Sequence, residues 1–367
     1  MKPNINIKKV LIAPLDWGLG HATRCIPIIE AFLKLGWEVI IAADGAPAAL
    51  LKEQFPDLSF IYLEGYKIRY TQKKSLLVFK LVFQIPRLLK KIRTEKSWLA
   101  KTINEHKIDL VISDNRYGLS AEQCLSVFIT HQLLIKTPFK FTDHLLQKIN
   151  YHFINKFSIC WVPDMKGKGI AGELSHPQKM PAIPVEYMNP ISRFKKSSMP
   201  IEFDICFSIS GPEPQRTILE NIICNQLKTI NGKFVVLRGL PGNAVRPHSF
   251  SKEVTVYNHL PTKALNELFL KSKVIVCRSG YTTVMEIMSL GKKALLIPTP
   301  GQTEQEYLAA YLNKQSFALS ANQSSLQLTD SIKTLNNVQL KQPVIDEFNI
   351  TLLEQLLNNL FAQHNNA

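Results

Sequence analysis

Short apolar runs alternate with longer helical stretches along this chain. The runs are rich in valine, isoleucine and leucine and lack the alternating polar positions of a strand that faces water. They are therefore typical of strands buried on both faces of a parallel sheet. Five lie in the first half of the chain and five in the second: 10–13, 39–42, 110–113, 127–130, 159–162, 205–208, 234–237, 254–257, 274–277 and 294–297. Two such series separated by helices predict an α/β protein with two doubly wound, parallel-sheet domains.

A stretch rich in proline and polar residues, 181–200, separates the two series and contains the predicted linker. The predicted domains are therefore 1–190 and 200–342. The last segment, 343–367, carries apolar residues at helical spacing. It is predicted to form a helix and a tail that pack back on the first domain.

The composition excludes two classes of protein. Of the 367 residues, 46% are hydrophobic, which is enough to bury two cores and argues against a disordered chain. No apolar run approaches the roughly 20 residues of a membrane-crossing helix, so a multi-span membrane protein is excluded. The run at 10–13 is also too short for the core of a signal peptide. The 6 cysteines form no Cys-x-x-Cys pair, which indicates buried thiols in a reducing cytoplasm rather than disulfides or a zinc site.

The charge is unevenly distributed. Lys and Arg number 44 against 29 Asp and Glu, a formal net charge of +15. Nine of the positive charges lie in 65–94, which contains no acidic residue. Polar residues from Lys73 to Lys91 share one face of a predicted helix there, and Pro86 predicts a break or kink.

A basic, otherwise apolar segment of this kind suits an anionic membrane surface. We therefore expect a cytoplasmic protein that binds the inner face of the cell membrane through 65–94. The alternative is an ordinary pair of core helices with a solvated basic stripe. No nucleic-acid-binding motif accompanies the charge, so a nucleic-acid partner is not expected.

A glycine-containing loop follows the first predicted strand. Gly18 and Gly20 permit a tight turn that turns backbone N–H groups and a helix N-terminus toward an anion or a sugar. His21 lies at the start of that helix, where the helix dipole favours the neutral form that a general base requires. The alternative is a histidine that only caps the turn. A dinucleotide site, with Asp44 on the ribose, is disfavoured because Thr23 occupies the third glycine position.

A second group of candidates follows the strand predicted at 274–277. Ser279 and Gly280 lie at a strand-to-helix junction with Thr282 and Thr283 beside them, a nest of N–H and hydroxyl groups suited to a diphosphate. Glu286 lies one helical turn further and would accept hydrogen bonds from both hydroxyls of a ribose. Its alternative role is a favourable interaction with the helix dipole.

Two further loops follow neighbouring strands. Glu304 and Gln305 come after the strand at 294–297 and would present hydrogen-bonding groups to a sugar at the same sheet edge. Gly211 and Arg216 follow the strand at 205–208. Arg216 would meet a phosphate there or simply lie on the surface.

These residues together resemble the MurG-like family 28 glycosyltransferases. The loop from Gly18 to His21 and the pair Asn189-Pro190 are similar to that family's first glycine loop and interdomain turn. The resemblance is strongest over 274–310, where the matching residues are Val276, Cys277, Arg278, Ser279, Gly280, Thr283, Glu286, Gly291, Pro298, Gln305 and Tyr307. It implies a GT-B fold, with two Rossmann-like domains facing an interdomain cleft, the nucleotide-sugar donor in the second domain and the acceptor in the first.

The resemblance also implies a role for several residues. Glu286 would hold the donor ribose and Gln305 the donor sugar. Ser279 and Gly280 would meet the diphosphate, and the adjacent Arg278 belongs to the same binding group.

The nucleotide base would lie against backbone near His259 and Leu260.

Two positions depart from the family pattern. The stretch Ser210-Gly-Pro-Glu-Pro214 replaces a Gly-Gly-Ser-Gln-Gly loop and removes a serine that contacts phosphate. Glu306 replaces a second glutamine of the donor-sugar loop, so the identity of the donor sugar does not carry over.

The residues and the resemblance together predict an inverting transferase. No Asp-x-Asp motif occurs in the chain, so helix N-termini and backbone N–H groups would stabilise the leaving diphosphate without a metal ion. His21, or failing it Asp16 or Asp114, would deprotonate the acceptor hydroxyl. The expected donor is a UDP-linked sugar such as N-acetylglucosamine, and the expected acceptor is a lipid or glycan of the cell envelope.

Three alternatives use the same architecture. The loop from Gly18 to Cys25 also resembles the sugar-nucleotide hydrolases of nonulosonic acid biosynthesis, which would use water as the acceptor. A UDP-N-acetylglucosamine 2-epimerase would need several carboxylates at the cleft, and the sequence identifies none. The last alternative is a sugar-nucleotide-binding protein without catalytic activity.

Overall fold

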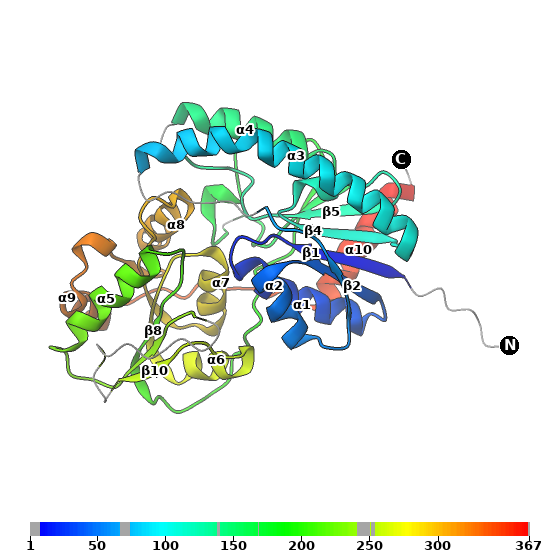
Figure 1. Ribbon diagram of the computed structural model, residues 1–367. Helices are drawn as coiled ribbons and strands as arrows, with labels where there is room; N and C mark the ends of the chain where they lie inside the picture. Colours follow the sequence, from blue (N-terminus) through cyan, green and yellow to red (C-terminus); the bar gives the residue numbers. More distant parts are fainter. Residues whose placement is uncertain are drawn as a thin grey trace. The chain divides into compact units, whose positions relative to one another are not determined.

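A computed structural model describes residues 8–66, 74–137, 140–167, 169–240, 250 and 254–365 of the protein. The chain divides into two compact units. Met1–Ile191 together with Asp346–Ala367 form the first unit, and Ser192–Ile345 form the second. Each unit is an α/β body built around its own sheet (Figure 1).

The sheet of the first unit has 7 strands in the order β3-β2-β1-β4-β5-β6-β7, and every pairing is parallel. The strands are β1 Lys9–Pro14, β2 Glu38–Ala43, β3 Ser59–Tyr62, β4 Leu110–Asp114, β5 Leu125–Ile129, β6 Ile159–Val162 and β7 Val185–Tyr187. All five runs predicted in this half of the chain coincide with strands, except that 127–130 extends one residue beyond β5. The two edge strands, β3 and β7, lie outside the predicted runs, because both are short and half-exposed and so lack a continuous apolar run.

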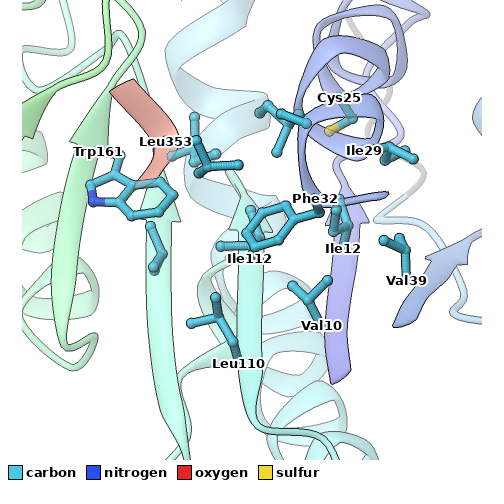
Figure 2. Close-up of a cluster of buried hydrophobic side chains, with 14 of the residues drawn as sticks. Val10, Ile12, Cys25, Ile29, Phe32, Val39, Leu110, Ile112, Trp161 and Leu353 are labelled. Carbon is cyan, nitrogen blue, oxygen red and sulfur yellow. The ribbon is translucent and has the colours of Figure 1, made fainter. Parts of the chain in front are cut away.

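Helices cover both faces of this sheet. Their bounds are α1 Gly20–Lys34, α2 Gly45–Gln54, α3 Lys74–His106, α4 Lys140–Ile154 and α10 Ile350–Asn365. Figure 2 shows the core on one face, where Phe32 of α1 lies beside Ile12 and Ile112 of the sheet and Leu353 of α10 joins them. On the other face, Leu99 of α3 packs against a second apolar cluster of the sheet.

The helix α3 continues through Pro86 without interruption, so of the break or kink expected there, the break does not occur. The ring of Pro86 is exposed, and the helix on its C-terminal side is held by buried residues such as Leu99 and Ile103. Side chains of 67–85, which carry part of the predicted basic face, lie outside the described residues. Within the described part of the chain, no helix combines the length and apolarity needed to cross a membrane.

The second unit repeats the design with a sheet of 6 parallel strands in the order β10-β9-β8-β11-β12-β13. Its strands are β8 Phe203–Ser208, β9 Phe234–Leu237, β10 Thr255–Tyr257, β11 Ser272–Cys277, β12 Lys293–Leu296 and β13 Leu319–Ser320, and its helices are α5 Gln215–Leu227, α6 Thr262–Leu270, α7 Tyr281–Leu290, α8 Thr303–Lys314 and α9 Leu328–Asn337. The five runs predicted in this half coincide with strands, although 254–257 and 294–297 each extend one residue beyond β10 and β12. Of the strands described in this unit, β13, a two-residue edge strand, lies outside the predicted runs.

The strand orders locate the functional loops. In each sheet the chain winds outward from one central strand and then reverses, between β1 and β4 in the first unit and between β8 and β11 in the second. Ligands of open parallel sheets bind beyond the carboxyl ends of the strands at such reversal points. The loops that carry His21, Asp114, Ser279 and Gly280 begin at these two positions, whereas Gln305 and His259 follow the neighbouring strands β12 and β10.

Candidate active site

A histidine–aspartate pair lies where β1 and β4 end in the first unit. Asp114 is the last residue of β4 and stands in register with Pro14, the last residue of β1. His21 is the second residue of α1, which starts just after the loop that follows β1. The Nδ1 atom of His21 lies 3.0 Å from Oδ1 of Asp114. The structure therefore brings two of the three predicted bases into direct contact.

The Asp114 carboxylate is fully buried and held by Arg24. Arg24 Nε donates to Oδ2 at 2.6 Å, and Arg24 Nη2 donates to Oδ1. Burial by itself would raise the pKa of Asp114, but the Arg24 guanidinium and His21 hold that pKa well below its usual range. Asp114 therefore stays ionised, and with no exposed surface it is suited to orienting His21 rather than to meeting a substrate.

The Nε2 atom of the His21 ring is the nitrogen that could accept a proton from a substrate, because Nδ1 contacts Asp114. Its side chain is 14% exposed, whereas that of Asp114 is not exposed at all. When the proton resides on Nδ1 and is donated to Asp114, Nε2 carries the free lone pair of a neutral imidazole. This is the arrangement of a general base whose orientation is fixed by a carboxylate.

Arg24 and His131 complete this group, and sequence reasoning assigned a role to neither. Arg24 Nη1 lies 3.2 Å from Nδ1 of His131, the second residue after β5. Arg24 stands three residues after His21 on α1, a spacing that places both on one helical face and was the available signal. His131 had the weaker signal of following a predicted strand.

Asp16, the third predicted base, holds a neighbouring segment in place. Its Oδ1 accepts the backbone N–H of Tyr66 at 2.8 Å. Gly65 packs so closely that a Cβ there would lie 2.2 Å from Asp16 Oδ2. Gly18 adopts φ 77° and donates its N–H to the Asp16 carbonyl at 3.0 Å, which forms the tight turn that the glycine loop predicts. Gly20 is the first residue of α1.

Glu286 is the central candidate of the second unit. It lies in α7, is 4% exposed, and accepts a hydrogen bond from Arg193 Nε at 2.7 Å on Oε1. Arg193 Nη1 in turn donates to Thr262 Oγ1 at 3.1 Å. Burial raises the pKa of Glu286 above its usual value, and the Arg193 charge and hydrogen bond only partly oppose that rise.

Ser279 and Gln305 meet beside α7. Ser279 Oγ donates to the Gln305 carbonyl at 2.8 Å, and Gln305 Oε1 accepts the Thr299 N–H at 2.9 Å. Gly280 immediately precedes α7, and nothing lies within 4 Å of the place where its Cβ would be. The N-terminus of α7 is therefore open to an approaching group at this point.

The other predicted donor residues occupy the same sheet edge. Thr282 and Thr283 lie in the first turn of α7, and Glu304 lies in the first turn of α8. His259 and Leu260 lie between β10 and α6. Among the described residues, no group of three or more His, Cys, Asp or Glu side chains is placed to hold a metal ion.

Comparison with known sequences matches residues 215–350 to the glycosyltransferase family 28 C-terminal domain. A relative from Buchnera aphidicola is 24% identical over 91% of this chain and 90% of its own length. A second, from Haemophilus ducreyi, is 23% identical over 93% of this chain and 90% of its own length. Both are named UDP-N-acetylglucosamine--N-acetylmuramyl-(pentapeptide) pyrophosphoryl-undecaprenol N-acetylglucosamine transferase. These matches support the resemblance to the MurG-like family 28 glycosyltransferases.

Solved structures agree on the fold of this chain. MurG from Acinetobacter baumannii aligns with a TM-score of 0.52 at 14% identity, over 90% of this chain and 89% of its own. The spinosyn rhamnosyltransferase SpnG aligns with a TM-score of 0.64 at 14% identity, over 90% of this chain and 92% of its own. The predicted GT-B fold is confirmed by these alignments and by the two parallel sheets.

Arg278 faces backbone carbonyls. It is 1% exposed, and its guanidinium donates to the carbonyls of Ser210, Gln215, Ile297 and Pro298. Burial lowers the pKa of Arg278 to about 10. Arg278 therefore ties together the loops that follow β8 and β12. A Cβ added to Gly211, whose φ is 107°, would lie 3.6 Å from Arg278 Nε.

Arg216 is buried rather than lying on the surface. Its Nη1 donates to Glu220 at 2.8 Å, and its Nε donates to Glu213 at 2.5 Å. Arg238, which the sequence did not single out, shares Glu220 through a 2.5 Å bond from Nε. Because Arg216 is 6% exposed, the alternative of a surface residue is wrong. Its Nε and Nη1 donate to carboxylates rather than pointing at a site for a phosphate.

Proposed function

We propose that this protein is an inverting glycosyltransferase that moves N-acetylglucosamine from UDP-N-acetylglucosamine to a lipid-linked acceptor. The support is the match of about 90% of both chains to relatives with that donor and a lipid-linked acceptor in their names. The geometric observation that carries the chemistry is the contact of His21 Nδ1 with the buried Asp114 carboxylate.

The proposed reaction begins at His21. Nε2 takes the proton of the acceptor hydroxyl as the oxygen attacks the anomeric carbon of the donor. The bond between that carbon and the diphosphate breaks, UDP leaves, and the configuration at the carbon inverts. Asp114, held ionised by Arg24, stabilises the imidazolium that forms.

The proposed donor site lies at the carboxyl edge of the second sheet. Glu286 holds the ribose, Gln305 the sugar, and the backbone at Ser279 and Gly280 the diphosphate. The open N-terminus of α7 supports this, because its N–H groups and dipole favour a negative charge. In this proposal these groups, without a metal ion, stabilise the charge that develops on the leaving diphosphate.

An assay with labelled UDP-N-acetylglucosamine tests the function. We expect UDP release and labelled product only when an undecaprenyl-pyrophosphoryl N-acetylmuramyl-peptide is present. Release at the same rate without lipid would support a hydrolase instead, and formation of the 2-epimer would support an epimerase. The comparisons favour neither of these alternatives.

We further propose that the protein works at the cytoplasmic face of a membrane. Leu89 of α3 is exposed (37%), as are Leu145 (58%) and Ile149 (40%) of α4. Exposed basic residues on the described part of α3 include Arg87, Lys90 and Arg93. Exposed apolar and basic side chains together favour an anionic lipid surface.

Vesicle sedimentation tests this association. Binding to vesicles with anionic lipid should exceed binding to neutral vesicles, and salt should weaken it. The triple variant Arg87→Ala, Lys90→Ala, Arg93→Ala should lose up to about 1 kcal/mol of binding per charge removed. Equal binding to both vesicle types would contradict the proposal.

A further inference from the structure

The buried carboxylate of Glu286 is held by an arginine far away in the sequence. Arg193 lies 93 residues before Glu286 and is the second residue of the second unit. The two side chains are only 11% and 6% exposed. Their contact runs from Nε to Oε1, whereas Oε2 has no partner among the described residues.

Arg193 is itself fixed at several points. Its Nη1 donates to the hydroxyl of Thr262, the first residue of α6. Its guanidinium carbon lies 5.1 Å from the ring centroid of Phe194. Phe194 is 1% exposed and packs edge-on against Phe269 of α6 at 5.4 Å. The arginine therefore has a restrained position from which it orients Glu286.

The contact matters because the Glu286 side chain is almost completely removed from solvent. Transfer of a carboxylate out of water favours its neutral form, and a neutral carboxyl has lost the charge that strengthens hydrogen bonds from hydroxyl groups. The other titratable group that interacts with Glu286 among the described residues is the Cys277 thiol, whose pKa burial raises, so it stays protonated. Arg193 is thus the cation that keeps the negative charge on Glu286.

We propose that Arg193 is a positioning residue for nucleotide binding. It holds the Glu286 carboxylate through Oε1 and leaves Oε2 to accept from the ribose. The inference rests on the proposed function, since it needs a ribose-bearing donor in this site. It assigns Arg193 an action through Glu286 on the nucleoside, which is distinct from a direct contact with the phosphates.

Titration calorimetry with UDP, and ligand-observed NMR with uridine, tests the proposal on the full-length protein. Arg193→Ala should lower the affinity for both ligands by about tenfold, which corresponds to about 1.4 kcal/mol of binding free energy. Arg193→Lys should restore part of the loss, because it keeps the charge but not the guanidinium geometry. Lys195→Ala, which removes an exposed charge two residues away, should leave both affinities unchanged.

A double-mutant cycle separates this action from others. Glu286→Gln should lower the affinity for both ligands. Adding Arg193→Ala to it should lower the affinity little further, because the two residues act as one unit. Fully additive effects would overturn the proposal. A weaker affinity for UDP with an unchanged affinity for uridine would also overturn it, because that is the result expected of a phosphate contact. A gain in affinity would overturn it as well, because it would mean that Arg193 obstructs the site.

Kinetics and stability complete the test. Arg193→Ala should raise the donor KM while changing kcat less, and melting curves establish that the variant is folded. Unchanged uridine binding in folded Arg193→Ala alone would overturn this inference and leave the proposed function intact. No binding of UDP by the wild-type protein would overturn the proposed function and this inference with it.

Discussion

Both units place a buried carboxylate beside an arginine, but the two pairs differ in what they leave unsatisfied. Arg24 bonds both oxygens of Asp114, and His21 adds a third contact. Arg193 bonds a single oxygen of Glu286. The pKa of Asp114 is accordingly lowered, whereas that of Glu286 is raised.

The comparison shows how the number of contacts sets the use of a carboxylate. With its oxygens bonded to Arg24 and His21 and no exposed surface, Asp114 offers no atom to a ligand. Glu286 keeps one oxygen without a described partner and so has acceptor capacity for a ligand. The sequence alone would place both among the polar residues that follow or flank a strand end.

The largest effect is expected from His21→Ala, which removes the proposed base. The value of kcat should fall by about 10²–10⁴-fold, the usual contribution of general base catalysis. Binding of UDP should be unchanged, because His21 belongs to the first unit and the proposed nucleotide site lies in the second. His106→Ala, at the exposed end of α3, serves as the control. Retained kcat would remove His21 from the base role.

Asp114→Asn should destabilise the first unit by about 3–5 kcal/mol, because it leaves the buried charge of Arg24 uncompensated. The folded-state pKa of Asp114 is below the unfolded value of about 3.9, so its stabilisation is present above that value. It is lost as the pH falls further, toward the folded pKa. The difference in Tm between wild type and variant should therefore shrink below about pH 4. A constant difference down to pH 2 would contradict this account.

The pKa of Glu286 is shifted in the opposite direction from that of Asp114, so its effect should be lost at a higher pH. Since its folded pKa is raised, the carboxylate becomes protonated at a higher pH than an exposed glutamate does. The affinity for UDP should therefore decrease as the pH is lowered toward that pKa, and Glu286→Gln should remove this part of the pH dependence. The same profile in wild type and in Glu286→Gln would show that another group titrates.

The smallest effect on folding is expected from Gly280→Ala. The φ of Gly280 is −67°, and its added Cβ would meet nothing within 4 Å, so Tm should be nearly unchanged. The affinity for UDP should still fall several-fold, because the methyl group would occupy the proposed approach of the diphosphate to α7. The control is Gly65→Ala, whose Cβ would collide with Asp16, so that Tm falls while UDP binding persists.

Local patterns in the sequence were sufficient for much of the fold. Each of the ten predicted runs overlaps a strand to within one residue, and the resemblance to family 28 agrees with the comparisons. A buried parallel strand has a continuous apolar run, and a tight turn such as the one at Gly18 needs a glycine, so both signals are contained in a few adjacent residues. Edge strands such as β3 have no such signal.

The partners of the buried charges were decided only by the tertiary structure. Arg24 and Asp114 are 90 residues apart, and Arg193 and Glu286 are 93 apart. The strand order brings the ends of β1 and β4 together, and no local periodicity specifies that order. The sequence by itself thus determined which segments form strands and which loops carry polar groups. Packing decided which carboxylate is fully bonded and which keeps an oxygen that has no partner in the described part of the chain.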